Sequence, residues 1–240
     1  ADGTFEKEVA LKLVKRGMDT DEALRRFHAE RRILAGLDHP HVARLLDAGA
    51  HDDGRPFLAM ELAEGEPITV YADAHRLGVP ARLDLFEQTV EAVAYAHRRL
   101  IVHRDLKPSN VLVTEDDDGA PRAVLLDFGI AKLLDDGAER SLVRTATEQR
   151  LLTPAYAAPE QVRGEPPTTA TDVYALGVLL YELLTLRLPF WATHRKELLW
   201  RVVAGDFTHP RQRVPSANIP AELEAVVLRA MAHKRADRYP

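Results

Sequence analysis

The sequence predicts an α+β fold built from two lobes. Short strand-like runs and one helix pattern fill the first third of the 240 residues, whereas the remainder shows long apolar patterns at helical spacing. Near residues 61–66 a strand-like run ends at a stretch containing glycine and proline, which is typical of a boundary between compact units. We therefore assign residues 1–62 to a partial N-terminal lobe and residues 63–240 to a C-terminal lobe.

The N-terminal lobe is predicted to contain strands and a single capped helix. Alternating residues indicate a strand over residues 8–15. Asp19 is placed to cap a helix that runs to about residue 34. Two further apolar runs predict strands over residues 42–46 and 56–61.

The C-terminal lobe is predicted to be mainly helical. Apolar residues at helical spacing indicate an amphipathic helix over residues 81–99, and residues 173–186 are apolar all round, as in a buried central helix. Two short strands, 111–113 and 124–126, flank the acidic loop 115–119. That loop could suggest a metal site, but its spacing does not match a calcium loop and favours a solvated turn.

Composition excludes several classes of function. The chain is 46% hydrophobic, which suits a sizeable core, and its net charge of −5 argues against a nucleic-acid partner. It has no cysteine, which excludes disulfides, thiolate zinc sites and cysteine nucleophiles and favours a reducing compartment. The longest apolar run is broken by Glu182 and is too short to cross a bilayer, so we expect no membrane segment in this chain.

Two charged residues stand on otherwise apolar faces. Lys12 lies within the first strand, and Glu30 lies at helical spacing from Phe27 and Leu34. Because an unpaired buried carboxylate is strongly destabilising, we expect Lys12 and Glu30 to form an ion pair. The alternative is that both lie at the margins of the surface.

The strongest pattern is the loop 101–110, which contains the sequence HRDLKPSN. Downstream, an apolar strand ends at the DFG sequence of residues 127–129. With VALK at 9–12, the helix residue Glu30 and APE at 158–160, these motifs resemble the protein kinase signature in order and context. The resemblance covers residues 1–240. It implies a bacterial-type, eukaryotic-like Ser/Thr protein kinase domain, with a small antiparallel N-lobe sheet and a mainly helical C-lobe.

The resemblance implies ATP-dependent phosphate transfer to protein hydroxyls. Asp105 would orient the acceptor hydroxyl and take its proton, while Lys107 would stabilise charge on the transferred phosphate. A lysine at this position is typical of the Ser/Thr branch. His103 could be read as a general base, but the resemblance favours a packing and hydrogen-bonding role.

For the nucleotide, the resemblance implies that Lys12, held by Glu30, contacts the α- and β-phosphates of ATP. Asn110 and Asp127 would ligate Mg²⁺, with Mn²⁺ as the alternative ion. A second group of residues would hold the adenine. Backbone groups of Glu61 and Ala63 would pair with the base, and Ala10 and Leu112 would sandwich its faces; ordinary core packing is compatible with the same positions.

Residues 153–160 resemble the segment that receives a substrate peptide. Thr153 would hydrogen-bond to the catalytic aspartate and lysine. Two polar contacts would be structural: a buried ion pair between Glu160 and Arg238, and Asp172 holding the backbone of the catalytic loop. The alternative for Asp172 is a simple helix-end carboxylate.

The polar stretch before residue 153 resembles an activation loop. Arg104 precedes the catalytic aspartate, a pattern that accompanies activation by loop phosphorylation. We therefore expect autophosphorylation in trans at Thr145 or Thr147. An unregulated mobile loop is the alternative.

The chain also departs from the family pattern. It lacks the Gly-rich loop and the first strands, and it ends before the last helix, so we expect it to be a fragment truncated at both ends. Leu152 and Leu186 stand where glycine is common. The resemblance implies a cytoplasmic kinase domain, in a parent protein that can carry a membrane anchor.

Two other functions remain open from the sequence. A small-molecule phosphotransferase would share the fold and the catalytic aspartate, but such enzymes generally lack the peptide-docking segment at 153–160. A pseudokinase scaffold would lack activity, but the lysine, both aspartates and the asparagine of the signature are all present.

Overall fold

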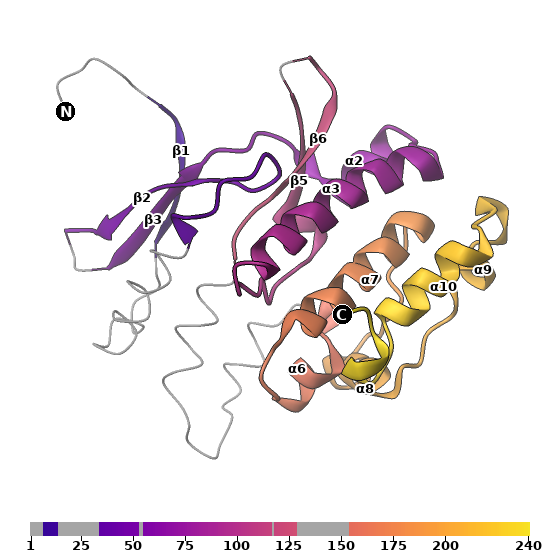
Figure 1. The fold of residues 1–240 in the computed structure, drawn as a ribbon. Coiled ribbons are helices and arrows are strands. Elements are labelled where there is room, and N and C mark those ends of the chain that lie inside the picture. The colour runs from indigo at the N-terminus through magenta and orange to yellow at the C-terminus, as the bar shows by residue number, and fades with distance from the viewer. Residues whose placement is uncertain (1–6, 14–33, 53–54, 117, 129–153) are drawn as a thin grey trace.

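The computed structural model describes residues 7–13, 34–52, 55–116, 118–128 and 154–240. Its first sheet contains β1 (Val9–Leu13), β2 (Leu45–Ala50) and β3 (Pro56–Glu61), which are antiparallel in the order β1-β3-β2 (Figure 1). The strand predicted at 56–61 has the bounds of β3, whereas β2 begins three residues later than predicted.

The two faces of β1 differ in exposure. Val9, Leu11 and Leu13 are 41%, 57% and 37% exposed on one face. Ala10 and Lys12 alternate with them and are half-buried on the other face. Since successive strand residues point to opposite faces, Lys12 shares its face with Ala10.

The second sheet belongs to the C-terminal lobe. It contains β4 (Glu66–Pro67), β5 (Val111–Glu115) and β6 (Pro121–Leu125) in the order β4-β5-β6. The acidic turn between β5 and β6 is closed by Asp116, whose Oδ1 accepts hydrogen bonds from the backbone N–H groups of Asp118 and Ala120. The carboxylate therefore closes the turn, as the sequence analysis favoured.

Helices make up most of the remaining C-terminal lobe. In chain order they are α2 (Ile68–Ala74), α3 (Val79–His97), α6 (Pro159–Arg163), α7 (Thr169–Thr185), α8 (Arg195–Ala204), α9 (Pro210–Arg213) and α10 (Ala221–Ala230). Short 3-10 turns occupy Pro108–Asn110, Pro154–Tyr156, Pro215–Ala217 and Arg235–Asp237. Among the described residues, no helix is long and apolar enough to span a bilayer.

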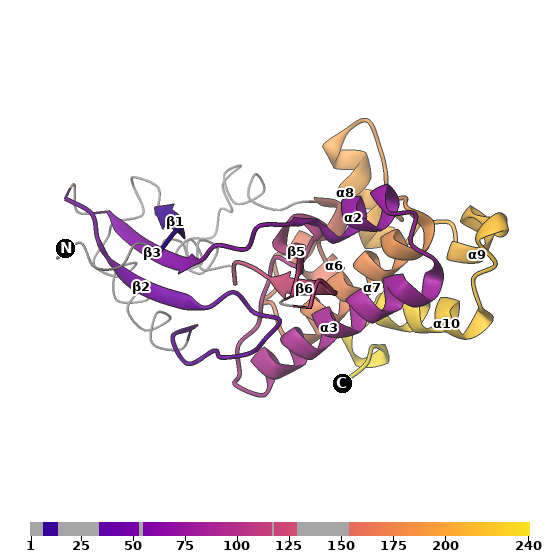
Figure 2. The ribbon, with the colours of Figure 1, turned by 90° about the horizontal axis from the view of Figure 1, so that it is seen from above.

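Helix α7 lies at the centre of this lobe, between α3 on one side and α10 on the other (Figures 1 and 2). Most of its side chains are buried, as its uniformly apolar sequence predicted. Leu179 and Leu183 join a core shared with α3 and both sheets, whereas Tyr181 and Leu184 join a second core with α8 and α10. Helix α7 therefore contributes buried side chains to both cores.

A short segment from the N-terminal lobe is attached to the second sheet. Val42 forms a bridge with Leu125, and backbone hydrogen bonds join Ala43 N–H to Leu125 O and Leu125 N–H to His41 O. These contacts connect the two lobes. The two-lobed α+β prediction, with a small antiparallel N-terminal sheet and a mainly helical C-terminal lobe, is thus confirmed.

Candidate active site

The candidate site is built on two segments that leave the second sheet. The loop before β5 ends in the turn Pro108–Asn110, and Asp127 follows β6. The two segments are joined by a hydrogen bond of 2.8 Å from Leu126 N–H to Asn110 O. The antiparallel pairing of β5 with β6 explains this proximity, because the start of one strand lies beside the end of the other.

Asp105 lies among polar partners within the loop. Its Oδ2 is 2.8 Å from Lys107 Nζ. The side-chain amide of Asn110 donates to the backbone carbonyl of Asp105 at 2.8 Å and lies 3.4 Å from Oδ2. The amide oxygen of Asn110 takes no part in these two contacts, because the nitrogen makes both.

Lys12, from the N-terminal lobe, contacts the segment that carries Asp127. Its Nζ lies 3.1 Å from Asp127 Oδ1, and the two side chains are 33% and 34% exposed. The Oδ1 atom is itself buried and accepts no well-oriented hydrogen bond from a described residue. A carboxylate oxygen in this condition, with the amide oxygen of Asn110 on the neighbouring segment, fits a hard divalent cation.

The oxygen donors of Asp127 and Asn110 are of the type that hard divalent cations bind. No group of three or more His, Cys, Asp or Glu side chains in the described part of the chain is arranged to enclose a metal ion. Mg²⁺ is usually bound through one or two protein ligands together with phosphate oxygens and water. A site with Asp127 and Asn110 is of that type.

Asp172, at the start of α7, holds the loop that carries Asp105. It is 1% exposed and accepts hydrogen bonds from the backbone N–H groups of His103 and Arg104, at 2.7 and 2.8 Å. His97 Nε2 lies 2.8 Å from the same carboxylate. Arg104 has φ 68°, an unfavourable backbone conformation for a non-glycine residue, and the bonds to Asp172 stabilise it.

His103 is held in one neutral form. Its Nδ1 accepts a hydrogen bond from Asp105 N–H, so Nε2 carries the proton and donates to Leu126 O at 2.8 Å. The ring packs 4.9 Å from that of Phe128. Burial lowers the pKa of His103 below its usual value near 6.5, although nearby carboxylates oppose the shift. The geometry is that of a packing residue, since both ring nitrogens are engaged.

Sequence reasoning missed two contacts made by residues 156 and 161, each of which joins this part of the chain to another element. Gln161 in α6 accepts from Ala158 N–H and donates to Arg104 O, so it ties the start of α6 to the catalytic loop. Tyr156 donates a hydrogen bond of 2.6 Å to Glu182 in α7. Burial raises the pKa of Glu182, and the bond from Tyr156 only partly opposes this. The one available signal was Glu182, a charge inside an otherwise apolar helix.

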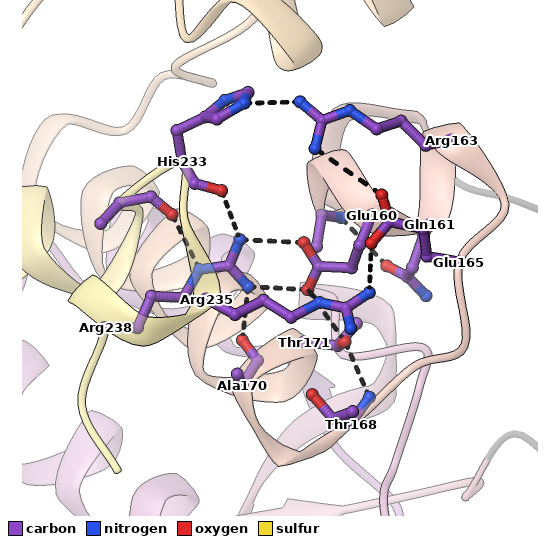
Figure 3. Close-up of polar contacts among 12 residues, drawn as sticks. Glu160, Gln161, Arg163, Glu165, Thr168, Ala170, Thr171, His233, Arg235 and Arg238 are labelled. Atoms are coloured by element: carbon purple, nitrogen blue, oxygen red, sulfur yellow. Dashed lines mark hydrogen bonds and ion pairs between the residues drawn. The ribbon is translucent and has the colours of Figure 1, made fainter.

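Glu160 lies in a buried cluster of polar contacts between α6, α7 and the C-terminal residues (Figure 3). Arg238 binds it with both terminal nitrogens, at 2.7 and 2.9 Å, and the two side chains are 0% and 2% exposed. Thr171 donates to Glu160 at 3.0 Å. Burial alone raises the pKa of Glu160, but these bonds and the charge of Arg238 outweigh it and leave the pKa below its usual value. The expected ion pair between Glu160 and Arg238 is present.

For the residues predicted to hold adenine, the structure gives positions in the fold. Ala10 pairs with Met60 across β1 and β3, Glu61 ends β3, and Ala63 lies in the linker that follows. Leu112 is half-buried in β5. The other predicted residues lie outside the described part of the chain: Glu30, Thr145, Thr147 and Thr153.

Known proteins match this chain over nearly its whole length. The sequence profile of the protein kinase domain family matches residues 3–238. Serine/threonine-protein kinase Pkn1 of Myxococcus xanthus is 39% identical over 221 residues, 91% of this chain and 30% of the relative. Serine/threonine-protein kinase PrkC of Bacillus subtilis is 35% identical over 237 residues, 98% of this chain and 35% of the relative.

A solved structure shares the fold. A double mutant of the Mycobacterium tuberculosis PknI kinase domain superposes with a TM-score of 0.69 at 29% identity, covering 99% of this chain and 81% of that one. The curated relatives are longer: the chain spans 30% and 35% of the two named above. The resemblance inferred from the motifs is confirmed by these matches.

Proposed function

We propose that this chain, which belongs to the protein kinase domain family, transfers the γ-phosphate of ATP to serine and threonine hydroxyls of proteins. One observation carries the proposal. Lys12 from the N-terminal lobe and Asp127 from the C-terminal lobe lie 3.1 Å apart, and Asp127 follows a segment bonded to the loop of Asp105 and Asn110. Phosphoryl transfer depends mainly on such placement of charges around a triphosphate.

The nucleotide is proposed to enter between Lys12 and Asp127. Lys12 binds the α- and β-phosphates, with Glu30 as its second carboxylate partner. Asp127 and Asn110 bind Mg²⁺, with Mn²⁺ as an alternative ion, which neutralises phosphate charge when present. The buried Oδ1 of Asp127, which accepts no well-oriented hydrogen bond from the described residues, supports this role.

Asp105 is proposed to act on the acceptor. It accepts the hydroxyl hydrogen of the substrate, positions the oxygen for attack and takes the proton as the bond to the γ-phosphorus forms and the bond from that phosphorus to the departing ADP breaks. Lys107, 2.8 Å from Asp105, stabilises the negative charge on the transferred phosphate. Asn110 keeps Asp105 in place through its bond to the backbone carbonyl.

The adenine is proposed to lie at the division between residues 1–62 and 63–240. Backbone groups of Glu61 and Ala63 pair with its edge. Ala10 and Leu112 cover its faces. The half-burial of Ala10 on the same strand face as Lys12 supports this arrangement.

Protein substrates are proposed to bind near residues 153–160. Thr153 contacts the catalytic aspartate and lysine, while the Glu160–Arg238 pair and Asp172 hold the surrounding backbone. We further propose autophosphorylation in trans at Thr145 or Thr147, and a cytoplasmic location, where ATP is available.

The experiment is an acceptor comparison with the full-length protein, radiolabelled ATP and Mg²⁺. We expect label to appear in a casein-type protein on serine and threonine, and none in aminoglycosides. Label in the aminoglycosides alone would identify a small-molecule phosphotransferase. No transfer to any acceptor, with nucleotide still bound, would identify a non-catalytic scaffold.

A further inference from the structure

A groove of about 800 Å³ lies beside the linker that joins the lobes. Its walls are the linker residues 61–66, a loop containing His39 and Arg44, helix α2 and the β5–β6 hairpin. None of Ala10, Lys12, Leu112 and Asp127, which we assign to the nucleotide, lines it. The groove therefore lies beside the proposed ATP site and shares with it only the linker residues Glu61 and Ala63.

The alternation of β5 explains this separation. Val113 lines the groove, whereas its neighbour Leu112 does not, because successive strand residues point to opposite faces. The linker thus has the proposed nucleotide site on one side and the groove on the other. Glu61 and Ala63 line the groove as well, so a ligand there would contact the segment proposed to pair with adenine.

The shape of the groove is fixed by close backbone packing. A Cβ atom added at Gly65 would lie 2.3 Å from the carbonyl oxygen of Val113, so only glycine allows the linker to approach β5 this closely. Glu66, the next residue, pairs with Val113 in the sheet. Val42 and Val124, which are 3% and 5% exposed, give the groove an apolar floor.

The rim of the groove is acidic. Glu64, Glu66 and Glu115 are exposed, and in the described part of the chain none of them forms an ion pair. Two arginines also line the groove: Arg44 is paired with Asp38 outside it, and Arg122 is outnumbered by the lining carboxylates Glu61, Glu64, Glu66 and Glu115. Charge complementarity therefore favours a cationic ligand.

An aromatic surface lies at the α2 side. The rings of Tyr71 and His75 stack with centroids 4.0 Å apart and an interplanar angle of 25°. Both residues line the groove. Flat aromatic faces favour arginine over lysine, because the planar guanidinium stacks on them.

From these features together we propose that the groove binds a basic, arginine-containing peptide segment of a partner protein. Guanidinium groups pair with the rim carboxylates, and aliphatic side chains contact the apolar floor. The groove is an open channel of mixed character, which suits an extended peptide. Binding of this segment does not require phosphate transfer, so it can be tested independently of the proposed activity.

The test uses the full-length protein and a fluorescein-labelled peptide, Arg-Leu-Arg-Arg-Leu-Arg-Gly, which has no hydroxyl to phosphorylate. Fluorescence anisotropy gives its affinity. We expect the triple variant Glu64→Gln, Glu66→Gln, Glu115→Gln to bind about tenfold more weakly, because each exposed charge pair contributes a factor of a few.

The matched control removes the same charge elsewhere. Asp84, Glu222 and Asp237 are exposed and do not line the groove, so Asp84→Asn, Glu222→Gln, Asp237→Asn should change the affinity less than about twofold. An equal loss in both triple variants would show non-specific attraction to the acidic chain and overturn the proposal. So would a failure of the unchanged protein to bind the peptide saturably.

A second measurement needs no variant. Hydrogen exchange of the unchanged protein, read by mass spectrometry, should slow at residues 62–66 and 113–115 when the peptide is added. An excess of a non-hydrolysable ATP analogue should leave that protection in place. Protection confined to the loop 101–110, or displaced by the analogue, would place the peptide in the active site and contradict the proposal.

Discussion

Two ion pairs connect distant parts of this chain, and they differ in environment. Arg238 and Glu160 lie 2.7 Å apart with side chains 0% and 2% exposed. Lys12 and Asp127 lie 3.1 Å apart with side chains 33% and 34% exposed. The first pair lies within the C-terminal lobe, and the second joins the two lobes.

The polar atoms of the two pairs are satisfied to different degrees. Arg238 also donates to the backbone carbonyls of Ala232, Ala170 and His233, so its charge is surrounded by protein acceptors. Asp127 Oδ1 has no well-oriented hydrogen bond from the described residues. The buried pair is complete in itself and stabilises the fold, whereas the half-exposed pair has capacity left for a ligand.

Breaking the buried pair should have the largest effect on stability. Arg238→Met leaves the carboxylate of Glu160 buried without its cation, and the free energy of unfolding should fall by about 3–5 kcal/mol. Chemical denaturation measures this. Arg211→Met, which changes an exposed arginine without an ion pair in the described residues, is the control and should change it by less than about 0.5 kcal/mol.

The loss of stability in Arg238→Met should also depend on pH, in a direction that the pKa of Glu160 determines. Because the pKa of Glu160 in the folded protein lies below its usual value of 4.5, the pair stabilises above that pH and the stabilisation is lost as the pH falls through the folded pKa. The difference between Arg238→Met and the unchanged protein should therefore narrow in acid. A constant difference would contradict the assigned direction of the shift.

Breaking the half-exposed pair should affect activity instead. Lys12→Met removes the charge that we propose to bind phosphate, and kcat/KM should fall by about a hundred- to a thousandfold. The free energy of unfolding should change by less than about 1 kcal/mol, as for other exposed pairs. Steady-state kinetics and denaturation of the same preparation separate the effect on activity from the effect on stability. Lys7→Met is the control. A large loss of stability with normal turnover would contradict this account, because it would show that the Lys12–Asp127 pair stabilises the fold and does not serve catalysis.

Glu182 extends the comparison because it is a half-buried carboxylate that binds a tyrosine and, among the described residues, no cation. Its pKa is raised by burial, so its contribution to stability is lost as the pH rises through the folded pKa, opposite to Glu160. Glu182→Gln should therefore raise the free energy of unfolding at neutral pH by about 1 kcal/mol and leave it unchanged in acid. Denaturation at both pH values measures this, and a loss of stability at neutral pH would show that the charge itself is stabilising.

The smallest expected effect concerns the C-terminal end of α7, the helix that contributes to both hydrophobic cores. Leu186 has φ 52° in the left-handed region and is 37% exposed. Leu186→Gly should relieve this conformation and raise the free energy of unfolding by about 0.5–1 kcal/mol, after the entropy that glycine adds to the unfolded chain. Leu100→Gly is a comparable change at another exposed left-handed leucine. A decrease in both would show that the leucine contacts outweigh the strain.

The sequence predicted the elements whose apolar pattern is strong. Helix α7 was predicted at 173–186 and spans Thr169–Thr185, because uniformly apolar residues have few alternatives to a buried helix. The strand predicted at 42–46 was displaced from β2, which is Leu45–Ala50. Val42 is apolar because it packs against β6, and its pattern reports burial rather than strand pairing.

The sequence predicted which residues belong to the site better than it predicted the contacts between them. The motifs identified Lys12, Asp105 and Asp127, but nothing local to Lys12 shows that Asp127 lies 3.1 Å from it. The Lys12–Glu30 pair stays a prediction, because Glu30 lies outside the described residues. Gln161 escaped notice because a single glutamine has no periodic or charge signal, although it binds the catalytic loop.

The most direct test of the account replaces Asp105 by asparagine in the full-length protein. Phosphate transfer from radiolabelled ATP to a protein substrate and binding of an ATP analogue are measured on the same preparation. Loss of the proton acceptor should lower turnover by about a hundred- to ten-thousandfold while nucleotide affinity stays within about twofold. Turnover equal to that of the unchanged protein would contradict the account.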